Sequence, residues 1–337
     1  MTPLSTPNEL QKRGIYTFET LEASLGDEVN YVMEGLLTDK SVNLIAGDSG
    51  IGKTPLCLTI ALCIAAGIPF LGMKTPRPRR VLYCDAESSR TAFHSVVSTL
   101  SRYLRLKSVP HNFHVWSPNW DESLQGINYS NALFQKAEWN GFQPEVVFID
   151  PLRVFFPEAD LKRDVALTYL KRMRRINNGG VTWLIVHHTR KPNVDEKPPA
   201  IEDNPHTWFH EVAGQHAIIN HVDTRLGVEA TPQREGSEMT MGGFVRMLGP
   251  IPPVYLARSY DDEGNPQGYM RASSLDLLVP DYRAAFHQLP TPGEVFTFKM
   301  ASNTLGKSDS SANNMLKRFK SIGAIKQVPG GYTKLHQ

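Results

Sequence analysis

The sequence has few cysteines, no apolar run long enough to cross a bilayer and almost no excess of charge. Its three cysteines (Cys57, Cys63 and Cys84) lie within apolar runs and form no CxxC spacing. This argues against a disulfide framework and predicts buried thiols in a reducing compartment. The longest apolar run, Leu56–Ile68, is shorter than the ~18–20 residues of a membrane-spanning helix, and the N-terminus lacks a signal-peptide pattern. We therefore expect a cytoplasmic protein without a membrane partner.

The charges are nearly balanced, with 36 Lys and Arg against 34 Asp and Glu and a formal net charge of +2. A near-neutral total neither favours nor excludes nucleic acid, because it can hide a local basic stripe. The length of 337 residues, with 41% apolar residues, suits one large domain and an appendage. We predict a polar N-terminal arm over residues 1–30, a large domain over residues 31–275 and a small domain over residues 276–337.

Strands and helices alternate through the first two thirds of the chain. Short apolar runs predict strands at Ser41–Ala46, Val81–Asp85, His114–Ser117, Val146–Asp150 and Thr182–His187. Helices are predicted at residues 54–66, 90–106, 130–141 and 163–177. This alternation favours an α/β fold with a mostly parallel sheet and crossover helices.

The segment after the fifth predicted strand is less regular. Asn193–Asn204 is rich in proline and acidic residues and lacks periodicity, which predicts a loop. Short strands are expected again from Ala217 to Ala272, with turns at Gly242-Gly243 and at Asp261–Gly264.

A glycine-rich segment of the Walker A type joins the first predicted strand to an apolar helix. Consecutive backbone N–H groups in such a loop form an anion-binding nest, and the helix N-terminus adds a positive dipole end. We expect Lys53 to reach the β- and γ-phosphates of ATP and the Thr54 hydroxyl to ligate Mg²⁺. The predicted nucleotide-binding residues are Gly47, Asp48, Ser49, Gly50, Ile51, Gly52, Lys53 and Thr54.

Two predicted strands end in carboxylates. The apolar strand Val146–Asp150 ends in an acid, as a Walker B strand does, so Asp150 is predicted to hold Mg²⁺. Proline follows Asp150, so the base that activates water must come from elsewhere. Glu87, after the strand Val81–Asp85, is the favoured candidate, and Asp85 is its rival, with a structural role as a strand-end cap.

Two adjacent histidines end the fifth predicted strand. Neighbouring side chains on a strand point to opposite faces, so only one of His187 and His188 can touch the γ-phosphate, and the other is structural. Zinc binding is a weaker reading, because no cysteine or HxxxH partner supports it.

The C-terminal segment has the element order of a winged helix. Helices are predicted at Phe296–Leu305 and Ser308–Ser321, followed by strands at Ile325–Val328 and Tyr332–Leu335 around a Pro-Gly-Gly turn. Helical spacing leaves a polar and basic face that forms a candidate DNA-backbone footprint, joined by Lys326 and Lys334 on the hairpin. A solvated face and a protein-contact surface are the alternatives. The candidate DNA-binding residues are Asn313, Asn314, Lys317, Arg318 and Lys320.

Five segments in order, GDSGIGKT, VLYCDAES, VVFIDPLRVF, WLIVHHTRKP and HVDTRLG, resemble the RepA-type plasmid replicative helicases. These are ring-forming P-loop ATPases of the RecA/DnaB-like superfamily, and the resemblance covers residues 30–270. It implies a RecA-like ATPase domain and a homohexamer with ATP at its subunit interfaces, acting on single-stranded DNA. It further implies that Glu87 is the catalytic base, His188 the γ-phosphate sensor and Arg225 an arginine finger for the neighbouring subunit.

Two positions depart from that family. Its arginine about ten residues after the catalytic glutamate has no counterpart in Phe93–Val96, so either Arg90 or Arg102 takes its place or that sensor is absent. Pro55 directly after Thr54 is unusual, although proline is tolerated in the first turn of a helix.

Three functions follow from these patterns. The first is an ATP- and Mg²⁺-dependent DNA helicase or translocase of a plasmid, phage or other mobile element. The second is a non-helicase DNA-binding ATPase of the same fold, such as a regulator, loader or defence component. The third is a small-molecule kinase, which would need neither Arg225 nor a DNA-reading tail. Forked-duplex unwinding separates the first two.

Overall fold

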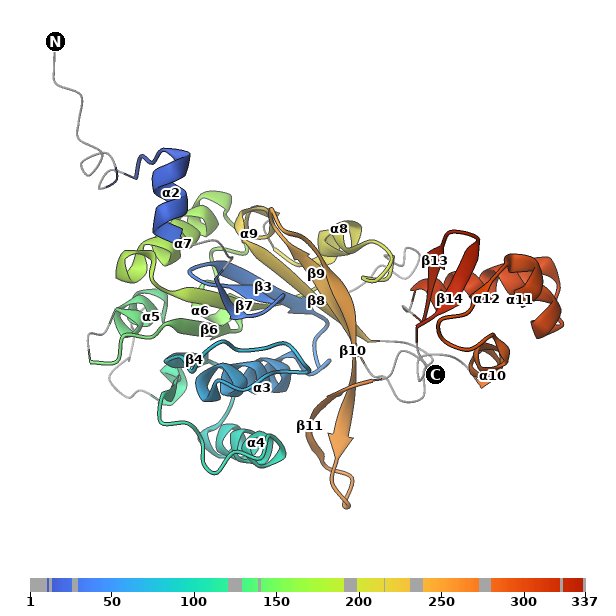
Figure 1. Ribbon diagram of the computed structural model, residues 1–337. Coiled ribbons are helices and arrows are strands. Elements are labelled where there is room, and N and C mark those ends of the chain that lie inside the picture. The colour runs from blue at the N-terminus through green and yellow to red at the C-terminus, as the bar shows by residue number, and fades with distance from the viewer. Residues whose placement is uncertain are drawn as a thin grey trace, which may run out of the picture.

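A nine-stranded sheet forms the centre of the protein, with helices on both of its faces (Figure 1). The computed structural model describes residues 11, 14–25, 30–120, 129–138, 141–190, 199–214, 216–230, 239–272, 280–321 and 324–335. The strand order is β11-β10-β9-β8-β3-β7-β6-β4-β5. The strands are β3 (Val42–Gly47), β4 (Val81–Asp85), β5 (Phe113–Trp116), β6 (Val146–Asp150), β7 (Thr182–His188), β8 (Thr224–Ala230), β9 (Met239–Val245), β10 (Gly249–Tyr260) and β11 (Pro266–Arg271).

The strands from β8 to β5 run parallel, and β9, β10 and β11 extend the sheet as an antiparallel edge. Every residue of β3, β4 and β6 is buried, as is typical of parallel strands covered on both faces. The register pairs Gly47 with His188 and Asp85 with Asp150. Because parallel strands end at one edge of a sheet, these strand ends lie near one another.

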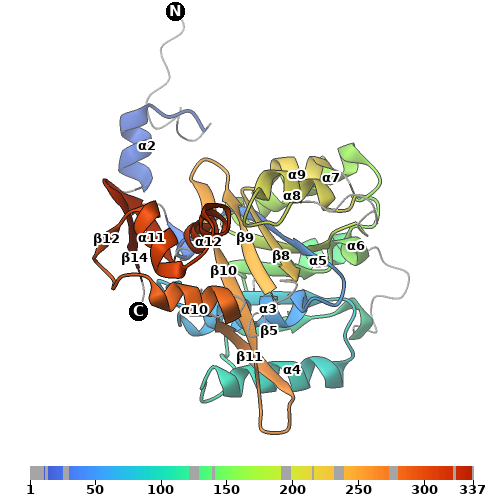
Figure 2. The same cartoon turned by 90° about the vertical axis from the view of Figure 1, so that its right-hand side faces the viewer.

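Two helix layers cover the sheet, and Figures 1 and 2 place them on opposite faces. Helices α3 (Lys53–Ala66) and α4 (Arg90–Tyr103) cover one face. The other face carries α5 (Tyr129–Ala137), α6 (Leu152–Phe155), α7 (Arg163–Arg175), α8 (Pro205–Trp208) and α9 (His216–His221), together with the 3₁₀ turn Phe209–Glu211. The described residues contain no helix that is long and apolar enough to span a membrane. The predicted α/β fold with crossover helices is confirmed.

Helix α3 contains two of the three cysteines. Cys57, Cys63 and Cys84 are all buried and form no disulfide, as predicted. Burial raises the pKa of the Cys63 thiol to about 12, so this thiol stays protonated at neutral pH.

Two predictions in the second half of the chain are wrong. The expected strand at Ala217 is instead the helix α9, whose apolar residues Ala217, Ile218 and Ile219 pack against the sheet. Gly242-Gly243 is not a turn but lies inside β9. A Cβ at Gly243 would overlap the backbone oxygen of Arg225 on β8, so glycine is needed there for close approach of the strands. The turn at Asp261–Gly264 is confirmed by the bond from the Gly264 N–H to the Asp261 carbonyl, 3.0 Å.

The N-terminal part is small. Helix α2 (Phe18–Leu25) lies within the predicted N-terminal arm, and β1 (Tyr31–Met33) pairs with β2 (Leu37–Thr38) in a small hairpin that the sequence did not predict. Residues 193–198 of the predicted loop Asn193–Asn204 lie outside the described residues, and residues 199–204 form turns and irregular structure, as predicted.

The C-terminal unit, defined here as residues 280–335, has a core of its own around Phe286, Phe296 and Phe319. It lies beside the sheet rather than on its helical layers (Figure 1). Its elements are α10 (Pro280–Gln288), β12 (Val295–Phe296), α11 (Phe298–Leu305), α12 (Asp309–Ser321), β13 (Ile325–Val328) and β14 (Gly331–Lys334). The strands form a three-stranded antiparallel sheet in the order β12-β14-β13. Helix α12 contacts the large domain through an ion pair of 2.8 Å between Arg318 and Glu202, which lies in the turn before α8.

Candidate nucleotide-binding site

The phosphate loop lies between β3 and α3 and depends on its glycines. Gly50 and Gly52 have φ angles of +79° and +102°, a left-handed backbone conformation that is unfavourable for residues other than glycine. A Cβ at Gly47 would overlap the Val228 carbonyl on β8. The loop therefore folds tightly against the neighbouring strand and delivers the chain into the N-terminus of α3, where free N–H groups favour an anion.

The Lys53 side chain is folded back into this loop and is only 5% exposed. Its Nζ donates to the carbonyl oxygens of Gly47 (2.9 Å) and Asp48 (2.7 Å) and lies 3.3 Å from Nδ1 of His188. Burial lowers the pKa of Lys53, and the nearby Asp150 carboxylate opposes that shift. The ammonium is thus held over the loop by groups that fix its position.

Asp150 lies at the end of β6, opposite the start of α3. Its Oδ2 accepts a hydrogen bond of 2.7 Å from the Tyr83 hydroxyl, and its side chain is also hydrogen-bonded to Thr54. Burial raises the pKa of Asp150 to about 6, although both hydrogen bonds act in the opposite direction. A hydroxyl and a carboxylate that meet in this way are hard oxygen ligands, so Thr54 and Asp150 fit Mg²⁺. A bound cation would favour the ionised carboxylate.

The two carboxylates after β4 have different surroundings. Asp85 is 1% exposed, and its Oδ1 accepts from the backbone N–H groups of Glu87 (3.1 Å) and Ser88 (2.7 Å). Its Oδ2 accepts from the Ser88 hydroxyl at 2.8 Å. These bonds give Asp85 the strand-end cap role. Glu87 is exposed and lines the same cavity as Lys53 and Asp150.

The adjacent histidines point to opposite faces, as predicted. His188 contacts Lys53, whereas His187 is buried with its Nε2 3.0 Å from the Ala213 carbonyl and 3.4 Å from Asp160. Burial, with Lys53 adding to it, lowers the pKa of His188 to about 4, so the ring is neutral at pH 7. Because the ammonium can only donate, Nδ1 accepts and Nε2 carries the proton. Among the described residues no group of three or more His, Cys, Asp or Glu is arranged to hold a metal ion.

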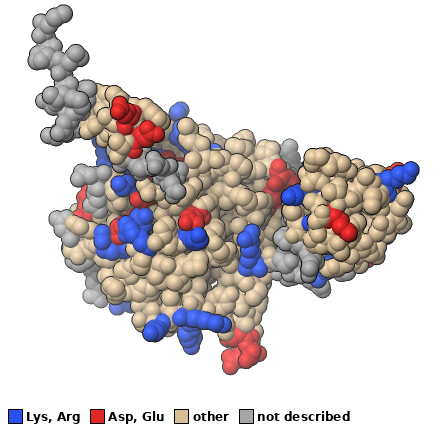
Figure 3. Space-filling model, in the orientation of Figure 1, with Lys and Arg blue, Asp and Glu red and all other residues tan. Residues whose placement is uncertain are grey.

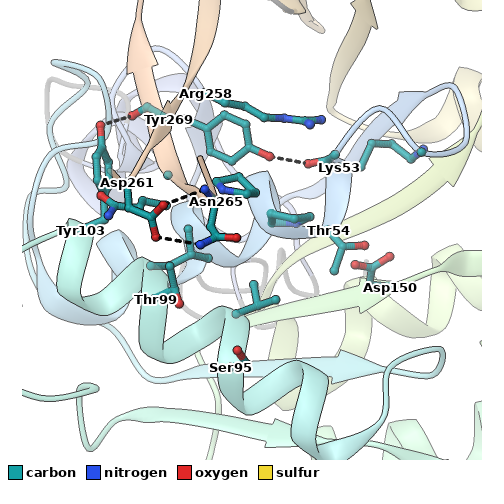
Figure 4. A pocket seen from close by; sticks show the side chains of 18 of the residues that line it. Lys53, Thr54, Ser95, Thr99, Tyr103, Asp150, Arg258, Asp261, Asn265 and Tyr269 are labelled. Atoms are coloured by element: carbon teal, nitrogen blue, oxygen red, sulfur yellow. Dashed lines mark hydrogen bonds between the residues drawn. The ribbon is translucent and has the colours of Figure 1, made fainter. Parts of the chain in front are cut away.

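A cavity of about 1050 Å³ joins these residues, and Figure 4 shows it from close by. The predicted residues Ser49, Gly50, Gly52, Lys53, Thr54, Glu87, Asp150 and His188 all line it. Arg102 lines it too, whereas Arg90 donates to the Trp120 carbonyl at 2.7 Å. Of the two arginines considered for the missing family position, Arg102 is the one that faces this cavity.

The sequence did not predict the opposite wall, which is the β10–β11 hairpin. Arg258 donates to the Ile51 carbonyl at 3.0 Å, and the Tyr269 hydroxyl donates to the Gly52 carbonyl at 2.9 Å. Each pair is separated by more than 200 residues along the chain, so local pattern carries no signal for these contacts.

Arg225 does not line this cavity. It pairs in register with Leu44, whose side chain packs on the sheet face opposite α3. Its guanidinium lies 4.7 Å from the centre of the Phe244 ring and lines a separate hollow with Arg190, His206, His210 and His216, among others. The structure thus places Arg225 outside the nucleotide cavity of its own chain.

The candidate DNA-binding residues of α12 fall into two groups. Asn313, Asn314, Lys317 and Lys320 are exposed. Arg318 is instead engaged with Glu202, and its side chain is 22% exposed. The proposed role of Lys334 in the footprint does not fit, because Lys334 is buried with its Nζ 4.5 Å from the centre of the Phe286 ring. On the face drawn in Figure 3, Lys and Arg are spread over both parts of the molecule.

The meeting of Lys53, Thr54 and Asp150 at one edge of a mostly parallel sheet is the arrangement of a P-loop ATPase of the RecA-like superfamily. A family model described as "AAA domain" matches residues 6–194. That is more than half of the chain, and the protein therefore belongs to this family.

Two curated relatives are DNA repair proteins named RadA. The protein from Synechocystis sp. is 22% identical over 231 residues, covering 66% of this chain and 43% of the relative. The protein from Streptococcus pneumoniae is 25% identical over 246 residues, covering 70% and 50%. The match thus spans about half the length of these relatives. A crystal structure of the RadB recombinase covers 71% of this chain and 93% of its own, with 11% identity and a TM-score of 0.43, too low for a fold assignment.

Proposed function

We propose that the protein is a DNA helicase or translocase that hydrolyses ATP at the interfaces of a homohexamer. The observation that carries this proposal is the cavity in which Lys53, Thr54, Glu87 and Asp150 meet. The names of the RadA relatives, which are DNA repair proteins, support DNA as the partner.

The chemistry follows from the positions of the side chains. Lys53 and the loop N–H groups hold the β- and γ-phosphates, and Glu87 takes the proton of the attacking water. His188 donates its Nε2–H to a γ-phosphate oxygen and so responds to the loss of that group. Thr54 and Asp150 would hold Mg²⁺, which would supply positive charge to the phosphates.

Arg225 acts in trans in this proposal. A guanidinium that lies outside its own cavity can stabilise the equatorial oxygens of a neighbour's triphosphate. Hydrolysis then depends on the position of the adjacent subunit, which is the coupling that a ring motor needs.

The C-terminal unit is the proposed winged-helix domain. Exposed Asn313, Asn314, Lys317 and Lys320 on α12, with Lys326 on the hairpin, supply amides and cations for the phosphate backbone of DNA. Arg318 joins them only when its contact with Glu202 opens.

That contact also favours a second candidate function, an ATP-regulated DNA-binding protein that is not a helicase. In the described arrangement Arg318 of α12 is engaged with the ATPase part of the chain, which suits a protein whose ATP state controls DNA binding.

Unwinding of a forked duplex separates the two functions. The helicase proposal expects unwinding that requires ATP and Mg²⁺, and ring-sized particles in a non-hydrolysable ATP analogue. ATPase activity that duplex DNA stimulates, with no unwinding, supports the regulator and contradicts the helicase.

A further inference from the structure

The cavity extends well beyond its phosphate end. At about 1050 Å³ it lies at the top of the range of roughly 300–1,000 Å³ that is usual for small-molecule sites. Its far end lies between α4 and the β10–β11 hairpin. Figure 4 shows Ser95, Thr99 and Tyr103 along α4, facing Asp261 and Asn265 at the turn of the hairpin.

The lining of this far end suits a nucleoside. Ser95 and Thr99 carry hydroxyl groups, Asn265 and Gln267 carry amides, and the apolar residues Val96 and Leu100 line the same end. The Asn265 Nδ2 donates to Asp261 Oδ2 at 3.2 Å within the turn, whereas the Thr99 hydroxyl accepts from Arg102 at 3.3 Å and keeps its own proton to donate. A base has flat apolar faces and a polar edge, and a ribose offers hydroxyl groups. A mixed wall of this kind can pack against the faces and hydrogen-bond the edges.

The hairpin is also hydrogen-bonded to the phosphate loop. Arg258 and Tyr269 donate to the carbonyls of Ile51 and Gly52, and the Tyr103 hydroxyl of α4 donates to the Tyr269 carbonyl at 3.1 Å. A Cβ at Gly268 would overlap the Tyr103 ring. The loop, the hairpin and α4 are therefore packed together closely.

These two carbonyls control the direction of two N–H groups. In a trans peptide the C=O of one residue and the N–H of the next point in opposite directions. Arg258 holds the Ile51 carbonyl, and Tyr269 holds the Gly52 carbonyl together with the Leu56 N–H of α3 (3.1 Å). The N–H groups of Gly52 and Lys53 are thereby turned the other way. Those are N–H groups of the phosphate-binding nest.

We infer that the β10–β11 hairpin is the nucleotide-selecting clasp of this ATPase, an inference that rests on the proposed function. Gln267, with Thr99 of α4, seats the nucleoside and determines specificity for it. Arg258 and Tyr269 are positioning residues that hold the phosphate loop in its binding conformation. The hairpin lies outside the segment 6–194 that the family model matches.

Competition binding on the full-length protein tests both parts. ATP and inorganic tripolyphosphate each displace a fluorescent ATP analogue, and the ratio of their affinities reports the nucleoside seat. Wild type should prefer ATP by about ten-fold or more. Gln267→Ala and Thr99→Val should each weaken ATP binding by about five-fold, the worth of one hydrogen bond, and leave tripolyphosphate binding unchanged.

Tyr269→Phe should act differently because it keeps the ring and removes only the donor to Gly52. It should weaken ATP and tripolyphosphate binding by the same factor, about five-fold, while the thermal unfolding midpoint falls by no more than about 4 °C. Arg258→Lys, which keeps a donor, should lose less than Arg258→Ala. Arg271→Ala is the matched control, since Arg271 is an exposed residue of β11 that does not line the cavity.

Three results would overturn the inference. One is equal affinity of the wild type for ATP and tripolyphosphate, and another is an unchanged ratio in Gln267→Ala. The third is normal tripolyphosphate binding by Tyr269→Phe. The variant Lys53→Ala shows whether the inference about the hairpin alone is wrong or whether the proposed ATPase function is wrong too. If wild type binds neither ligand better than Lys53→Ala does, the assignment of the nucleotide-binding site is wrong, and the inference about the hairpin is wrong as well.

Discussion

The edge of the large sheet and helix α12 of the C-terminal unit use charge in opposite ways. At the sheet edge, Lys53 and Asp150 are buried and each is held by specific partners. On α12, Lys317 and Lys320 are exposed to solvent. Electrostatic interactions are strong where water is excluded and weak where it is not. We therefore expect single substitutions to have all-or-none effects at the first region and graded effects at the second.

The largest effect is expected for Lys53→Ala. Loss of a buried cation from the phosphate site should reduce ATP turnover by on the order of 10³ or more and weaken ATP binding. Steady-state phosphate release and nucleotide titration measure the two effects. Lys317→Ala is the control and should turn over ATP at the wild-type rate, because Lys317 is exposed on α12 and does not line the cavity. A similar loss of turnover in Lys317→Ala would contradict the expected difference between the two regions.

Arg225→Ala should lower turnover by on the order of 10³, as loss of an arginine finger does, while ATP binding is retained. The neighbouring and exposed Arg246 offers a matched control in Arg246→Ala. Mixing Arg225→Ala with Lys53→Ala subunits should restore part of the activity, because a mixed interface can hold one intact site. Normal turnover by Arg225→Ala alone would show that the finger assignment is wrong.

Smaller and opposite effects are expected for two changes around α12. Glu202→Gln should release Arg318 and raise DNA affinity a few-fold. Lys317→Ala should lower DNA affinity a few-fold and reduce the slope of log affinity against log salt concentration by about one. Anisotropy titrations of a labelled oligonucleotide at several salt concentrations measure both. Equal DNA affinity of Glu202→Gln and wild type would mean that the Arg318 contact does not restrain binding.

Much of the phosphate site could be predicted because its residues are local in sequence. The loop, the start of α3 and the strand-end acids Asp85 and Asp150 follow from short patterns, and parallel topology brings them to one edge. Alternation along a strand is also a local rule, and it predicted that His187 and His188 point to opposite faces of the sheet.

The rest depends on long-range packing. Arg258 and Tyr269 meet the phosphate loop only because the antiparallel strands β10 and β11 fold back over it. Gly242-Gly243 has the composition of a turn, yet the close approach of β8 requires glycine inside a strand. Charge alone predicts a surface position for Lys334, but this residue is buried and its Nζ lies 4.5 Å from the centre of the Phe286 ring in the small core. Charge and composition do not reveal what another element will cover.

Glu87→Gln is best compared with Asp85→Asn, because both changes replace a carboxylate by its amide at positions two residues apart, one that lines the cavity and one that caps the end of β4. Single-turnover hydrolysis of ATP, with binding and thermal unfolding measured on the same samples, gives the answer. Glu87→Gln should bind ATP and fold as wild type does but should hydrolyse ATP at least about a hundred-fold more slowly. Asp85→Asn should chiefly lower stability. Hydrolysis at the wild-type rate by Glu87→Gln would contradict the assignment of Glu87 as the catalytic base.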